Sequence, residues 1–199
     1  AEAILVTLQK SGLTHARRDH PVAYLANNVE VWHGFDSFAR LAERLRKRDE
    51  GREYRAQADA LLPAIDRWFW DQAEGYYAAA VHAGGKRESG LGRWDPHWKA
   101  NLRAIALLPG DERRHDLFAR LARRAEPLPE KIETADDLEK LVGWGMAVLA
   151  RHNRAALEQY QLRLSRVAWD RLKDLDPALL GQALHVGGGT VSPAPEPEE

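Results

Sequence analysis

The 199-residue chain contains no cysteine, which excludes disulfides and thiolate metal sites. It has no apolar run near the roughly 20 residues that a membrane-spanning helix needs. It also has no excess of either charge, with 29 basic against 30 acidic residues. This balance argues against a dedicated nucleic-acid binder, which would carry a basic stripe. We therefore expect no nucleic-acid partner and no membrane span.

Motifs that bind cofactors or metals are absent as well. The chain has no phosphate-binding loop, no dinucleotide-binding glycine motif and no nucleophile elbow, so we expect no cofactor. Its histidines, among them His20, His33 and His82, do not have the spacing of metal ligands, and we expect no metal site. The start at Ala1 is compatible with signal-peptide removal, which would imply an exported or periplasmic protein.

Hydrophobic residues make up 44% of the chain, and most of them recur at helical spacing. The pattern predicts an all-α domain over residues 1–186, built from antiparallel helical hairpins. A tail over 187–199, rich in proline and glutamate, has the composition of a disordered segment. The predicted helices cover about 1–12, 24–51, 52–70, 95–108, 111–125, 134–152 and 153–172, with a short eighth starting at 176.

Local signals refine these boundaries. Gly51 is expected to end the second helix, and Pro63 to kink the third. Asp95, Asp111 and Asn153 are expected N-caps, and Thr134 with Asp137 resembles a capping box. Between the third and fourth helices, Gly84-Gly85 beside residues 76–82 predicts a short extended hairpin. No strand-rich region suggests a larger sheet.

The second helix, over residues 24–51, begins with an unusual group of polar and aromatic residues. Its expected inward stripe consists of Val31, Phe35, Phe38, Ala42 and Leu45. Asn28 lies at the N-terminal end of this stripe, where a buried amide must find hydrogen-bond partners. Glu30 lies beside the gap that Gly34 leaves. A carboxyl partly removed from water there could act as a general acid, although a carboxylate also favours the first helical turns through the macrodipole.

Aromatic residues concentrate between Trp68 and Trp98. Trp68, Trp70, Trp94 and Trp98 fall in this stretch together with Tyr76 and Tyr77. Aromatic rings beside polar groups suit flat ligands such as sugars, and the alternative is that the rings fill the core. Asp95 likewise is either a plain N-cap or a carboxylate held at a cleft between Trp94 and Trp98.

Four segments together resemble the six-hairpin (α/α) toroid glycosidases: "YLANNVEVWHGF", "EYRAQADALLPAIDRWFWDQAEGYYAAA", "GRWDPHWKANLRAIALLP" and "LVGWGMAVLA". The resemblance covers about residues 24–164 and implies a partial toroid, because three hairpins make half a ring. It also implies hydrolysis of a polysaccharide glycosidic bond by two carboxylates. The residues to which it gives roles are Glu30 and Asp95 as the catalytic pair, with Asn28, Trp32, Tyr77, Trp94, His97 and Trp98 binding the sugar.

Two further interpretations remain open at the level of sequence. Asn27 stands where the family element carries an acidic residue, which favours a non-enzymatic scaffold that binds a protein or an oligosaccharide on its concave face. A structural fragment without activity of its own is the other alternative. An open half-ring would expose apolar edges, so the chain is expected to self-associate or to pair with a missing N-terminal half.

Overall fold

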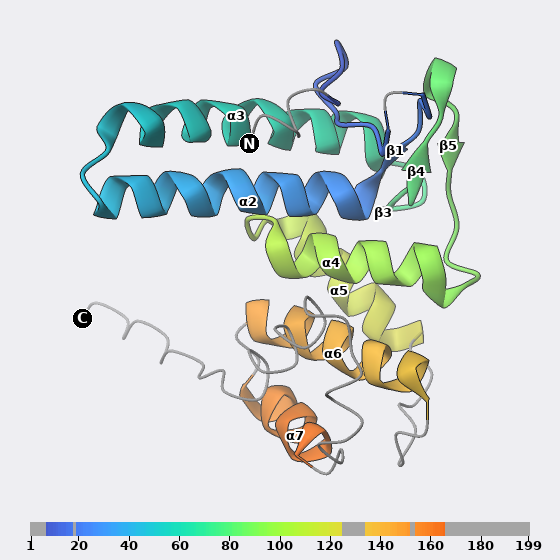
Figure 1. The fold of residues 1–199 in the computed structure, drawn as a ribbon. Coiled ribbons are helices and arrows are strands. Elements are labelled where there is room, and N and C mark those ends of the chain that lie inside the picture. Colours follow the sequence, from blue (N-terminus) through green and yellow to red (C-terminus); the bar gives the residue numbers. More distant parts are fainter. Residues whose placement is uncertain (1–6, 18, 125–133, 152–153, 166–199) are drawn as a thin grey trace. The chain divides into compact units, whose positions relative to one another are not determined.

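The computed structural model describes residues 7–17, 19–124, 134–151 and 154–165. The chain forms two compact units, residues 1–117 and 118–199, and each is described by itself. The described residues are mostly helical, as the sequence predicted (Figure 1). The helices are α2 (Leu25–Arg44), α3 (Arg48–Phe69), α4 (Lys99–Leu107), α5 (Glu112–Arg124), α6 (Ala135–Ala150) and α7 (Arg154–Leu164).

The first unit is built on the helical hairpin of α2 and α3, which lie side by side over their whole length (Figure 1). The predicted end of the second helix at Gly51 is wrong, because α2 already ends at Arg44 and the chain reverses at Arg46, which has a φ of 61°. Gly51 instead lies buried within α3. A Cβ there would lie 3.4 Å from the Glu43 side chain and 3.6 Å from the Ala39 carbonyl oxygen, which are ordinary contact distances, so this position packs against α2 without requiring glycine.

The buried face of α2 differs from the predicted stripe. Phe35 and Ala42 are buried as expected, but Phe38 and Leu45 are 52% and 60% exposed. The buried face of α2 instead includes Trp32 and Ala39. The physical reason is the partner helix: α3 lies along the side of α2 that carries the buried Ala39 and Ala42, whereas Phe38 stays half exposed beside the Tyr54 ring, 5.4 Å away between centroids.

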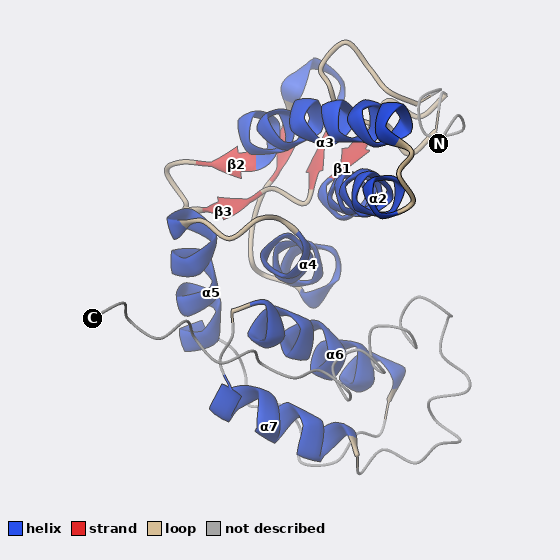
Figure 2. Ribbon diagram, turned by 90° about the vertical axis from the view of Figure 1, so that its left-hand side faces the viewer, coloured by secondary structure: helices blue, strands red, loops and turns tan. Residues whose placement is uncertain are grey.

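Two small antiparallel sheets lie at the N-terminal end of α2 (Figures 1 and 2). The first has the order β1 (Ala23–Tyr24), β4 (Ala80–Val81), β5 (Arg87–Glu88), and the second pairs β2 (Trp70–Asp71) with β3 (Tyr76–Tyr77). The predicted hairpin at Gly84-Gly85 is confirmed as the turn between β4 and β5. Both glycines have a positive φ, 78° and 82°, which only glycine adopts without cost.

The first predicted helix is wrong wherever the structure describes it. Residues 7–12 form a turn, closed by a bridge between Leu8 and Thr14. Gly12 has a φ of 82°, and a Cβ at this position would lie 3.1 Å from the Ala64 side chain. The segment therefore packs its turn against α3 and does not continue as a helix.

The remaining caps divide between confirmed and wrong predictions. Asp111 caps α5 by accepting a hydrogen bond from the Arg114 amide at 2.9 Å, and Thr134 and Asp137 form a complete capping box on α6. Asp95 has the extended backbone of a residue that precedes a helix, with φ −100° and ψ 130°, but its side chain makes no capping hydrogen bond, and α4 itself begins at Lys99. The predicted Asn153 cap, the helix from 176 and the tail from 187 lie outside the described residues.

The second unit has its own apolar core between α6 and α7. Its buried residues are Leu138, Leu141, Val142, Val148, Leu157 and Leu164. Phe118 meets Trp144 edge to face, with the ring centroids 5.9 Å apart. Both elements of the α6–α7 hairpin therefore contribute apolar side chains to one cluster.

Candidate functional site

Asn28 is fully buried at the start of α2, and its amide is completely used within the chain. Its Oδ1 accepts hydrogen bonds from the Thr14 amide at 2.8 Å and the Thr14 hydroxyl at 3.2 Å. Its Nδ2 donates to the carbonyl oxygens of Thr14 and Tyr24 at 3.0 and 2.9 Å. The prediction that this amide must find partners is confirmed. Those partners hold the 7–22 segment to α2 and leave no donor for a sugar.

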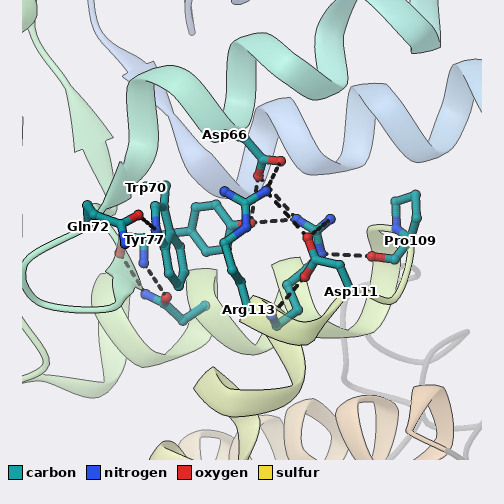
Figure 3. Close-up of polar contacts among 9 residues, drawn as sticks. Asp66, Trp70, Gln72, Tyr77, Pro109, Asp111 and Arg113 are labelled. Atoms are coloured by element: carbon teal, nitrogen blue, oxygen red, sulfur yellow. Dashed lines mark hydrogen bonds and ion pairs between the residues drawn. The ribbon is translucent and has the colours of Figure 1, made fainter.

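Tyr77 is also fully buried, so the predicted stacking of a sugar on its ring is wrong. Its hydroxyl donates to Asp66 Oδ1 at 2.7 Å and accepts from Arg114 Nη1 at 2.6 Å (Figure 3). Burial raises the pKa of the Tyr77 phenol well above its ordinary value; the Arg114 guanidinium lowers this pKa in part, and the Asp66 carboxylate raises it again. The phenol therefore stays protonated and serves as a donor inside the fold.

Arg114 brings a positive charge into this buried network. Its side chain is only 3% exposed, and its guanidinium contacts Asp66 at 3.1 Å, Asp111 at 2.8 Å and the Pro109 carbonyl at 2.7 Å. A buried cation requires opposite charges and hydrogen bonds of this kind, because they offset the free energy of hydration that it loses. Next to it, Arg113 reaches Asp66 at 2.8 Å and lies over the Trp70 ring (Figure 3). The network ties the start of α5 to α3 and β3.

A second buried amide joins β3 to α4. Asn101 Oδ1 accepts a hydrogen bond from the Tyr77 amide at 2.9 Å, and Asn101 Nδ2 donates to the Tyr77 and His97 carbonyls, each at 2.9 Å. Sequence reasoning missed Asn101. The available signal was an asparagine on the apolar side of a predicted helix, the same signal that identified Asn28.

Trp32 and His97 are buried as well, each 7% exposed, so neither presents a surface to a ligand. Both ring nitrogens of His97 are buried without a hydrogen-bond partner, and Glu88 Oε1 lies 3.7 Å from Nε2. The same carboxylate faces His82 and Arg93, each at 3.6 Å. Over the part of the chain that the structure describes, no three histidine, aspartate or glutamate side chains are placed to hold a metal ion.

The turn Trp94–Trp98 before α4 contains four of the predicted site residues, the buried His97 and three that are at least partly exposed. Trp94 and Trp98 are both partly buried, and between them the Asp95 side chain is 63% exposed. The Trp98 indole N–H donates to the Leu91 carbonyl at 2.8 Å, which fixes the ring against the 89–93 loop. Asp95 accepts a longer contact, 3.4 Å, from Lys99 Nζ.

Glu30 lies across from this helix on α2, and its side chain is 47% exposed. The Glu30 carboxylate is therefore only partly removed from water. Arg103 Nη1 contacts Glu30 Oε1 at 2.8 Å, and the Arg103 side chain is mostly buried, at 23% exposure. Lys99 and Arg103 are four residues apart and share one face of α4. Each predicted carboxylate thus has a cationic partner on α4 that sequence reasoning missed.

The candidate site that survives is a surface formed by Trp94, Asp95, Trp98, Lys99, Arg103 and Glu30, which we call the α4 surface. It contains two carboxylates with exposed side chains, two partly exposed indole rings and two cations that both belong to α4. Among the described helices, none has the length and apolar character needed to cross a membrane. No family model and no curated protein sequence matches this chain.

Proposed function

We propose that the chain binds carbohydrate at the α4 surface, as a helical-hairpin protein related to the six-hairpin glycosidases and with their partial toroid arrangement. The observation that carries this proposal is the turn Trp94–Trp98, which holds two partly exposed tryptophans on either side of an exposed aspartate. Indole rings offer apolar area to the faces of sugar rings at a small entropy cost. Carboxylates and cations beside them supply the polar contacts that orient a ligand.

The supporting geometry gives the tryptophans and the carboxylates different roles. Trp98 is fixed through its indole N–H, so its ring is already oriented before a ligand arrives, which lowers the cost of binding. Asp95 is held by Lys99 only at 3.4 Å. A sugar hydroxyl can therefore compete for this carboxylate more easily than for Glu30, whose contact with Arg103 is 2.8 Å.

Binding is tested by screening the chain on a glycan array and then titrating the strongest soluble oligosaccharide by calorimetry. Trp98→Ala is expected to weaken binding by about 1–3 kcal/mol, the usual loss of one aromatic anchor. Asp95→Asn is expected to weaken it less. Asp49→Asn is the matched control, because Asp49 is a 91% exposed carboxylate that pairs with Arg52 on α3, away from the α4 surface. Binding unchanged in Trp98→Ala, or no glycan bound at all, contradicts the proposal.

Hydrolysis is the second candidate, and it is favoured by two partly or mostly exposed carboxylates, Glu30 on α2 and Asp95 in the turn that leads into α4. An inverting glycosidase holds its pair roughly 6.5–9.5 Å apart, so that water fits between carboxylate and sugar. Release of reducing ends from the bound polysaccharide is the measurement. Glu30→Gln and Asp95→Asn should each abolish it. If the native chain binds the glycan but releases no product, hydrolysis is rejected and binding stands.

A further inference from the structure

We propose that the exposed face of α2 is a self-association surface, on which α2 of a second copy packs in antiparallel orientation. This face consists of Gly34, Phe38, Leu41 and Leu45, and we call it the α2 stripe. It is separate from the α4 surface, so the inference does not depend on whether the chain binds carbohydrate.

The first observation is the exposure of the stripe. Phe38, Leu41 and Leu45 are 52%, 50% and 60% exposed, although their spacing of three and four residues places them on one side of the helix. Nothing lies within 4 Å of the place where a Cβ of Gly34 would stand. Three large apolar side chains and an adjacent gap thus form one continuous strip. Such contiguous exposure marks an interaction site more often than scattered single residues do.

The second observation is the symmetry of the spacing, which is four, three and four residues from Gly34 to Leu45. This order reads the same in both directions. Two copies of α2 in antiparallel orientation therefore bring Phe38 of one copy opposite Leu41 of the other. In the same register, Leu45 of each copy meets the open space over Gly34 of the other. A two-fold interface requires this kind of self-complementarity, and a side chain that enters a gap is how packed helices interlock.

The charged residues near the α2 stripe decide the orientation in which a second copy packs. Two exposed arginines, Arg44 and Arg46, stand at the C-terminal end of the stripe, whereas the carboxylate of Glu30 before its N-terminal end is already paired with Arg103 of the same chain. An antiparallel pair keeps the arginines of the two copies at opposite ends of the interface. A parallel pair would place the arginines of both copies side by side, which like-charge repulsion disfavours. The stripe therefore fits a second copy of this chain in one orientation.

Sedimentation equilibrium of the full chain over a range of concentrations is the first test. The native chain is expected to show a monomer–dimer equilibrium. Leu41→Asp should raise the dissociation constant roughly a hundredfold or more, because it places an unpaired charge at the centre of the interface. Arg52→Asp is the control, because Arg52 is 79% exposed and lies on α3, outside the stripe. A native chain that is monomeric throughout, or a dimer that Leu41→Asp does not weaken, overturns the proposal.

Cross-linking tests the register. The chain has no cysteine, so each introduced thiol is the only one in its molecule. An equimolar mixture of Gly34→Cys and Leu45→Cys chains should form a mixed disulfide under mild oxidation. The same Leu45→Cys chain with an Arg40→Cys chain should not, because Arg40 points away from the stripe. Equal cross-linking in both mixtures overturns the antiparallel register, and circular dichroism confirms that each variant is folded.

Discussion

At the scale of single residues, the buried polar side chains determine which predicted site residues are structural. Asn28 and Asn101 each use both ends of their amide to connect separate segments. Tyr77 shares its hydroxyl between a carboxylate and a guanidinium. An unsatisfied buried polar group costs more than a formed hydrogen bond returns, so these contacts fix side chains that the sequence had suggested as ligand contacts.

Asn28→Ala is expected to lower the free energy of unfolding by about 2–4 kcal/mol, because it leaves the Thr14 amide and two carbonyls without their partner. Asn27→Ala is the matched control, since the neighbouring side chain is exposed and its loss should change stability by less than about 0.5 kcal/mol. Urea denaturation measures both. Equal effects in the two variants would show that the Asn28 network does not hold the 7–22 segment.

Tyr77 gives a prediction about pH. Because burial raises the pKa of its phenol in the folded state, the unfolded chain loses this proton first as the pH rises past about 10. The contribution of Tyr77 to stability is therefore complete below pH 10 and falls above it, by up to about 1.4 kcal/mol per pH unit. Tyr77→Phe should be less stable than the native chain at pH 7, and this difference should shrink between pH 10 and 12.

The measurement for Tyr77 is the free energy of unfolding in urea at a series of alkaline pH values, for the native chain and Tyr77→Phe. The difference between the two isolates Tyr77 from the other titrating groups. A gap that stays constant, or widens with pH, would contradict the assignment of a buried, protonated phenol.

At the scale of elements, the helix ends show which local sequence signals are sufficient to predict where a helix begins or ends. The capping box of Thr134 and Asp137 and the Asp111 cap form as the sequence indicates, because each needs only residues within one turn. The prediction that Gly51 ends a helix was wrong, because α2 already ends at Arg44 and the chain reverses at Arg46. Asp95 has an extended backbone but makes no capping hydrogen bond, and α4 begins only at Lys99.

Thr134→Ala is expected to destabilise α6 and its unit by about 1 kcal/mol, because the Asp137 amide loses its acceptor. Thr134→Ser should remain close to the native chain, since serine caps as well as threonine. Thermal unfolding followed by circular dichroism distinguishes the two. If the alanine and serine variants melt together, the box does not stabilise the helix.

At the scale of the whole molecule, a ligand of the α4 surface should appear in global stability. A glycan at a hundred times its dissociation constant stabilises the folded state by about 2.7 kcal/mol. The native chain should therefore melt at a higher temperature in its presence, and Trp98→Ala should show a smaller shift at the same glycan concentration. Equal shifts in both proteins would place binding elsewhere, whereas no shift in either would reject it.

The sequence by itself determined the helical class, the α2–α3 hairpin, the β4–β5 turn and two caps. These features depend on periodicity and on contacts within a few residues, and both are visible directly in the sequence. It also indicated that Asn28 would be buried and hydrogen-bonded, since an amide on an apolar stripe has no other acceptable state.

Only the tertiary structure decided which aromatic and carboxylate groups face solvent. Tyr77 and Trp32 are buried while Phe38 and Leu45 are exposed, because the neighbouring helices cover one side of α2 and leave another open. The partners of Glu30 and Asp95 on α4 were equally undetermined. Helical spacing states which residues share a face, but the segment that covers this face comes from elsewhere in the chain, and its position follows from packing.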